Sequence, residues 1–135
     1  MSNRGELCYS TRIYYDDTDA GGVMYYANYL KLCERAKQEF FLKHSCDLFE
    51  LHDRGVYLVV KDVKASYKKG IRLGERAEVY VAVLKLKKAS LTLEFSIEVE
   101  GQQRAYVEIV SVFVDRDLRI VRAPECVRNL PVAEE

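Results

Sequence analysis

The clearest pattern in the chain is an alternation of apolar and polar residues between positions 91 and 99. Leucine, phenylalanine, isoleucine and valine alternate there with threonine, serine and glutamate, which is typical of a strand with one buried face. Runs of period two also cover 56–67, 76–86 and 104–114, and residues 8–15 are rich in the β-branched and aromatic residues that favour strands. The chain is therefore predicted to contain five strands.

Between the first and second of these strands the hydrophobic period changes to that of a helix. An apolar stripe at spacings of three and four is formed by Tyr29, Cys33, Ala36 and Phe40. This spacing predicts a half-buried helix from about Met24 to about His44. A short helical turn is predicted at 47–55, and a short helical tail after Pro124.

The predicted order is one strand, one long helix and four strands joined mostly by short turns. Short connections favour antiparallel neighbours, so residues 68–75, 87–90 and 101–102 are expected to act as hairpin-type turns. A single long helix against an antiparallel sheet is an α+β architecture in one domain, residues 1–135. The helix should cover the concave face of the sheet. One helix covers only one face of the sheet, so the edges or the other face are left for another subunit, and a homo-oligomer is predicted.

Composition excludes several classes of partner. The 21 Lys and Arg residues balance the 21 Asp and Glu residues, so no bulk charge favours nucleic acid. No apolar stretch is long enough for a signal peptide or a membrane span, and a cytoplasmic location is predicted. The cysteines are far apart and have no CxxC spacing, so they are predicted to be reduced thiols. They are Cys8, Cys33, Cys46 and Cys126.

Candidate chemistry lies where the first strand leads into the helix. Asp16, Asp17 and Asp19 precede the pair Gly21-Gly22, and the helix follows at once. The first N–H groups of a helix have no partner inside it and can hold developing negative charge, so this segment suits an electrophilic carbonyl substrate. Aspartates are also good turn formers and helix caps, and that purely structural interpretation stands beside the catalytic one.

This acidic segment and the start of the predicted helix closely resemble a known family signature. Its parts are YDDTDAGGV at 15–23, ANYL at 27–30 and ERA at 34–36. They resemble the YbgC-like acyl-CoA thioesterases, which are hotdog-fold relatives of 4-hydroxybenzoyl-CoA thioesterase. The resemblance implies a central helix wrapped by a five-stranded antiparallel sheet, and dimers that pair into tetramers with sites between subunits. It also implies acyl-CoA hydrolysis without a metal or an organic cofactor.

The resemblance assigns the catalytic carboxylate to Asp19. This carboxylate can attack the thioester carbonyl directly or deprotonate a water that attacks, and the sequence leaves both routes open. Backbone N–H groups between Val23 and Tyr26 are the expected hydrogen-bond donors to the oxyanion, in particular those of Val23 and Tyr26 themselves. The residues expected to shape the loop are Asp17, Gly21 and Gly22.

Two basic turns are candidates for the phosphates of the CoA nucleotide. By resemblance, CoA binding is expected at the turn formed by Lys87, Lys88 and Ser90. Lys68, Lys69 and Arg72 form a second basic turn. Its geometry suits the phosphates equally well, but it resembles the family less closely. Solvated turns of this composition are also common, and lysine would act here as a positive point charge.

The chain departs from the family pattern at Tyr26, where many members carry histidine. The departure leaves room for an alternative function, a weakly catalytic or non-catalytic protein that binds acyl chains or acyl carrier protein. A dehydratase is disfavoured because no histidine lies near the helix start. His44 and His52 are expected to be partly exposed, and no zinc site or G-x-S-x-G serine elbow is predicted. Glu34 and Lys37 are expected to pair on the helix surface.

Overall fold

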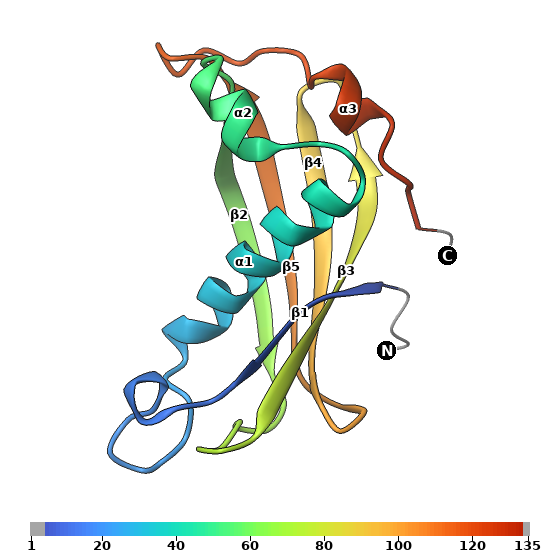
Figure 1. Ribbon diagram of the computed structural model, residues 1–135. Helices are drawn as coiled ribbons and strands as arrows, with labels where there is room; N and C mark the ends of the chain where they lie inside the picture. The colour runs from blue at the N-terminus through green and yellow to red at the C-terminus, as the bar shows by residue number, and fades with distance from the viewer. Residues whose placement is uncertain (1–4, 134–135) are drawn as a thin grey trace.

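The computed structural model describes residues 5–133 and shows one long helix lying across a curved sheet (Figure 1). The strands are β1 (Glu6–Arg12), β2 (Tyr57–Tyr67), β3 (Arg76–Leu86), β4 (Ser90–Val99) and β5 (Gln102–Val114). The helices are α1 (Ala27–Lys43), α2 (Leu48–Asp53) and α3 (Glu125–Arg128), with a 3-10 turn at Tyr15–Asp17. This arrangement confirms the predicted α+β architecture of one helix and five antiparallel strands.

The order of strands in the sheet is β1-β3-β4-β5-β2, and every neighbouring pair is antiparallel. The hairpins between β3 and β4 and between β4 and β5 agree with the prediction. The prediction that residues 68–75 form a hairpin turn is wrong, because β2 pairs with β5 and two strands separate it from β3. Residues 68–75 instead cross the end of the sheet, and Ile71 is fully buried there.

The core lies between α1 and the concave face of the sheet. The predicted helical stripe is buried, with Cys33 and Ala36 fully enclosed. The alternation in β4 places Phe95 and Ile97 in the same core as Phe40 of α1. Sequence periodicity therefore identified the inner face of both elements correctly. The prediction that only one face of β4 is buried is wrong, because Glu94, Ser96 and Glu98 on its other face are also buried in this central strand between β3 and β5.

Helix α1 begins at Ala27, three residues later than predicted. Met24 is apolar and fits the helical period, but its N–H group donates to the carbonyl of Ile71 at 2.7 Å. Val23 forms an antiparallel bridge with Arg72, and Met24 forms one with Thr18. These long-range bonds hold the backbone before Tyr26 in extended form, which overrides the local helical preference.

Two cysteines differ from the prediction of reduced thiols. Cys46 and Cys126 form a disulfide with Cα atoms 5.3 Å apart, which joins the segment between α1 and α2 to α3 across 80 residues of sequence. Cys8 and Cys33 are free. Disulfides are typical of oxidising compartments, so the cysteines no longer support the predicted cytoplasmic location.

Strand β2 forms one edge of the sheet. Its side chains are exposed on both faces from Val59 to Tyr67, and apolar residues such as Val60, at 48% exposure, are among them. The other edge strand, β1, is shorter, with seven residues. Among residues 5–133, no helix has the length and apolar character needed to cross a membrane.

Candidate active site

Asp17 ties the 3-10 turn to the start of α1. Its carboxylate accepts a hydrogen bond from the N–H of Tyr14 at 2.8 Å. Its carbonyl accepts from the N–H of Tyr25 at 2.9 Å and from the side-chain amide of Asn28 at 2.8 Å. Through both of its acceptor groups, Asp17 therefore fixes how the chain enters the helix.

Asp19 opens the tight turn that follows. Its N–H donates to the carbonyl of Val23 at 3.0 Å, and its carbonyl accepts from Gly22 at 3.1 Å. One carboxylate oxygen accepts from the N–H of Gly21 at 2.9 Å. Gly22 has a φ of 74°, a conformation that glycine adopts without strain. The turn orients the Asp19 carboxylate through one oxygen while the residue stays exposed to solvent.

The crossing segment 68–75 supports this turn from a distant part of the sequence. Leu73 donates its N–H to the carbonyl of Gly22 at 3.0 Å, beside the bond from Met24 to Ile71. The N–H of Ile71 donates to the hydroxyl of Tyr29 on α1 at 3.3 Å. The segment thus links the turn to the helix. Nothing in the local sequence pattern indicated this role.

A partly buried ion pair holds the crossing segment against β5. Both terminal nitrogens of Arg104 donate to the carboxylate of Glu75, at 3.0 and 2.9 Å, and one of them also donates to the carbonyl of Gly70 at 2.8 Å. Glu75 in turn accepts from the N–H of Arg72 at 2.7 Å. The hydrogen bonds from Arg104 lower the pKa of the Glu75 carboxyl. The pair is therefore charged at neutral pH and fixes the segment that carries Ile71.

Two backbone N–H groups near the helix start are unused. Met24 and Tyr25 donate to carbonyls, as described above, whereas within residues 5–133 the N–H groups of Val23 and Tyr26 donate no hydrogen bond. The Tyr26 side chain is 63% exposed, and its ring centroid lies 4.9 Å from that of Tyr25. Among residues 23–26, the two amides expected to stabilise an oxyanion are thus the two that donate no hydrogen bond.

The two basic turns lie at opposite ends of the sheet. The turn with Lys87, Lys88 and Ser90 joins β3 to β4 at the end where α2 and α3 lie, away from the acidic turn (Figure 1). The structure therefore does not bring these residues to Asp19 within one chain. The turn with Lys68 and Lys69 lies at the same end as Asp19, because the neighbouring Arg72 is bridged to Val23.

A small apolar cavity of about 160 Å³ lies between α1 and the sheet, and we call it the near cavity. It is lined by Leu30, Cys33, Glu34 and Lys37 of α1 and by Val60, Val63, Phe95 and Ile109 of the sheet. Burial raises the pKa of the Cys33 thiol, so it stays protonated and is a poor nucleophile. The near cavity begins at Leu30, about one turn into α1.

Neither histidine lies at the acidic turn. His44 is half-buried and pairs with Glu6, whereas His52 is exposed on α2. Among the described residues, no group of three or more His, Cys, Asp or Glu side chains is placed to hold a metal ion. The residues at this turn offer carboxylates, backbone amides, tyrosine hydroxyls and the hydroxyl of Thr18.

Comparison with known proteins places the chain in a family. A model of the thioesterase-like superfamily matches residues 14–130. The acyl-CoA thioesterase YbgC of Helicobacter pylori is 40% identical over 82 residues, which are 61% of this chain and 59% of that protein. The acyl-CoA thioester hydrolase YbgC of an Escherichia coli O6:H1 strain is 31% identical over 77% of this chain and 78% of its own length.

Solved structures agree with the sequence matches. The structure of a gentisyl-coenzyme A thioesterase superposes with a TM-score of 0.84 at 24% identity, over 89% of this chain and 98% of that one. A protein from Aquifex aeolicus gives the same TM-score over 89% and 94% of the two chains. The fold and the family match lead to one conclusion: the chain is a hotdog-fold member of the thioesterase-like superfamily.

Proposed function

We propose that this protein hydrolyses acyl-CoA thioesters and that Asp19 is its catalytic carboxylate. The observation that carries the proposal is the turn itself, where an exposed, oriented carboxylate lies in a segment with the unused N–H groups of Val23 and Tyr26. The names of the YbgC relatives support the choice of thioester chemistry.

The proposed reaction needs no group beyond those described. Asp19 attacks the thioester carbonyl carbon, or takes a proton from a water that attacks it. The carbonyl oxygen becomes an oxyanion, which one of the free amides at Val23 or Tyr26 stabilises. On the water route the carbon–sulfur bond then breaks, the proton held by Asp19 passes to the CoA sulfur, and the free acid is released. On the direct route the same bond breaks to leave an anhydride between the acyl group and Asp19, the CoA thiolate takes a proton from solvent, and one water cleaves the anhydride to the acid and the Asp19 carboxylate.

The acyl group is proposed to enter the near cavity, because this apolar space starts one turn into α1. The nucleotide phosphates are proposed to meet the basic turn of Lys68 and Lys69, which lies at the same end of the sheet. A contribution from Lys87 and Lys88 would require a second subunit. The exposed edge of β2 supports such an assembly, and a homotetramer is the proposed state. Sedimentation of the purified protein tests this directly, since a monomer would contradict it.

Thiol release from a panel of acyl-CoAs tests the catalytic assignment. Asp19→Asn should lower the rate at least about 100-fold, because the amide can neither attack nor accept a proton. Asp16→Asn is a matched control, since Asp16 is also exposed in this segment. Equal rates for Asp19→Asn and wild type, with both proteins folded, would rule out Asp19. Acyl-CoA binding without any hydrolysis by the wild type would favour a binding protein instead.

A further inference from the structure

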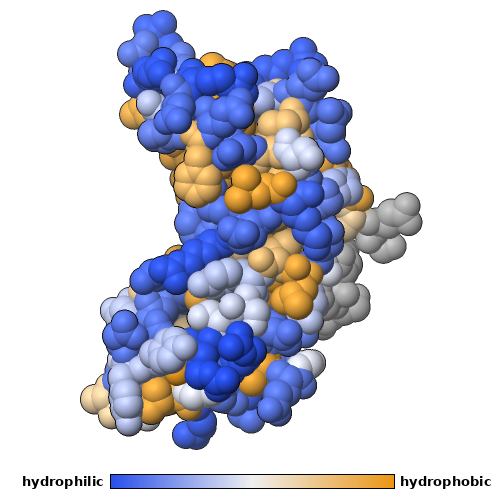
Figure 2. Space-filling view, viewed as in Figure 1, coloured by the Kyte–Doolittle hydropathy of each residue, from blue (hydrophilic) through white to orange (hydrophobic). Residues whose placement is uncertain are grey.

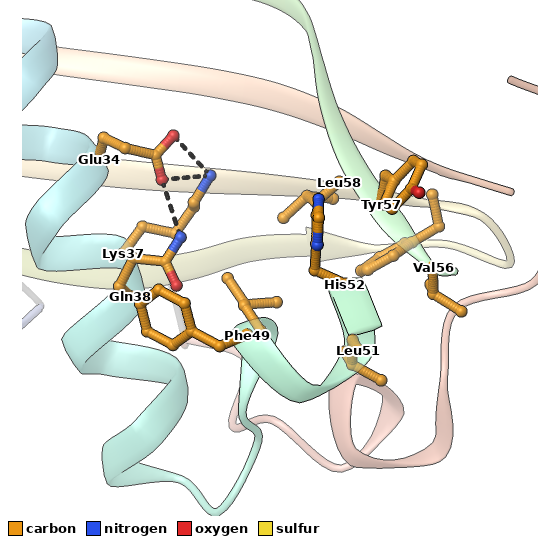
Figure 3. A pocket seen from close by; sticks show the side chains of 11 residues that line it. Glu34, Lys37, Gln38, Phe49, Leu51, His52, Val56, Tyr57 and Leu58 are labelled. Carbon is orange, nitrogen blue, oxygen red and sulfur yellow. Dashed lines mark hydrogen bonds and ion pairs between the residues drawn. The ribbon is translucent and has the colours of Figure 1, made fainter. Parts of the chain in front are cut away.

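A second and larger cavity lies beyond the near cavity, further along α1. We call it the far cavity; its volume is about 390 Å³, and α2 and the start of β2 form its opposite wall (Figure 3). Its apolar lining consists of Leu48, Phe49, Leu51, Val56, Leu58 and Phe113. In the space-filling view the outline of the molecule is indented on this side, between α2 and the start of α1 (Figure 2).

Two residues line both cavities, and no other described residue does. They are Glu34 and Lys37, whose side chains form an ion pair with a shortest distance of 2.7 Å. The Lys37 side chain is only 8% exposed, so the expectation of a surface pair is wrong for the lysine. The Glu34 carboxylate also accepts from the side-chain amide of Gln38 at 3.3 Å (Figure 3). A charged, hydrogen-bonded partition therefore stands between the apolar near cavity and the far cavity, whose lining also includes His52 and Tyr57.

The positions along the helix put this partition in the path of a long acyl chain. Leu30 lies three residues after the first residue of α1 and Lys37 lies ten after it, which at 1.5 Å per residue is about 5 and 15 Å along the helix. A chain bound at Asp19 would meet the near cavity first and the ion pair last. An apolar cavity of about 150 Å³ holds one benzene ring, so the near cavity, at about 160 Å³, holds roughly six carbons.

We propose that Lys37 sets the acyl-chain length that this protein accepts, by closing the near cavity against the far cavity. This proposal rests on the proposed thioesterase function. A longer chain can continue only by displacing the Lys37 ammonium from Glu34 or by folding back into water, and both are unfavourable. Without the ammonium, further methylenes could enter the far cavity, where each buried methylene improves binding about fourfold.

The experiment compares the chain-length profile of kcat/KM for wild type and Lys37→Met, with straight-chain acyl-CoAs from four to sixteen carbons. Methionine keeps a similar length and removes the charge, and Glu34 can hydrate because its side chain is 51% exposed. The wild type should prefer chains of up to about six carbons. The variant should raise the ratio of the twelve-carbon to the six-carbon substrate at least tenfold.

Lys31→Met is the matched control, because Lys31 is exposed on the same helix and lines neither cavity. Its profile should equal that of the wild type. Val63→Phe provides an independent variant that fills the near cavity, and it should shorten the preferred chain below six carbons. An unchanged profile in Lys37→Met overturns the proposal, and so does a wild type that prefers sixteen carbons. A wild type without any thioester hydrolysis overturns the proposed function itself, so the two failures are distinguishable.

Discussion

Replacing Arg104 with methionine tests how strongly the crossing segment depends on its ion pair. The Arg104 side chain is 7% exposed, and it makes two hydrogen bonds to Glu75, one to Gly70 and one to Gln102. Removing one partner of a buried pair costs about 3–5 kcal/mol. The Glu75 side chain is 28% exposed and can hydrate, so the low end, about 3 kcal/mol, is expected. In a domain of this size that lowers the melting temperature by about 10 °C.

The loss should also depend on pH. Arg104 lowers the pKa of folded Glu75 below its ordinary value of 4.5, so the pair contributes stability above that value. This contribution disappears as the pH falls through the lower, folded pKa. The difference in free energy of unfolding between wild type and Arg104→Met should therefore be largest near pH 7. It should shrink below about pH 4.

Urea denaturation at pH 7 and at pH 3.5 measures both effects. Arg76→Met is the control, because Arg76 is exposed and its side chain hydrogen-bonds only to Ser10 among the described residues, so the cost of this change should stay within about 0.5 kcal/mol. A double-mutant cycle with Glu75→Gln isolates the pair itself. A cost below about 1 kcal/mol for Arg104→Met, or one that is the same at both pH values, would refute this account.

Three further changes test other contacts of the fold. Tyr29→Phe leaves the buried N–H of Ile71 without its acceptor, and urea denaturation should show a loss of about 1–3 kcal/mol. Gly22→Ala forces alanine to a φ of 74°, so thermal melting should show a loss of about 1–2 kcal/mol, with a fall in kcat as the turn distorts. Cys126→Ser opens the 80-residue loop closed by Cys46, which costs up to about 4.5 kcal/mol of chain entropy. Dithiothreitol should lower the melting temperature of the wild type and leave that of the variant unchanged.

Local pattern was sufficient to identify which side of an element packs into the core, although it did not predict that the polar face of β4 is buried as well. The alternation at 91–99 reflects one face against α1, and the helical stripe reflects one side against the sheet. Where a distant segment decides the backbone conformation, the pattern failed. Met24 fits a helix by its spacing, yet Ile71 holds it in extended form. The Cys46–Cys126 pair likewise has no local signal, because only the folded chain brings α3 beside the end of α1.

The residues of the candidate site divide in the same way. The segment from Asp17 to Gly22 is continuous in sequence, so its turn could be anticipated from composition and spacing alone. The location of Lys87 and Lys88 depends on which end of the sheet their hairpin occupies. Within a single chain, that end is the one opposite to Asp19. Lys37 was expected on the surface because its spacing from Glu34 is that of a helix surface pair. That spacing carries no information on which other parts of the chain cover the pair.

The bridge between the acidic turn and residues 71–73 also has a consequence for the timing of folding. Contacts between segments this far apart form late, because the entropy of closing a long loop must be lost before the contact is made. During synthesis on the ribosome, α1 can form before residues 71–73 emerge from the exit tunnel. During renaturation, helical circular dichroism should therefore recover first, and the proposed thioester hydrolysis should return only after residues 71–73 have bound the acidic turn.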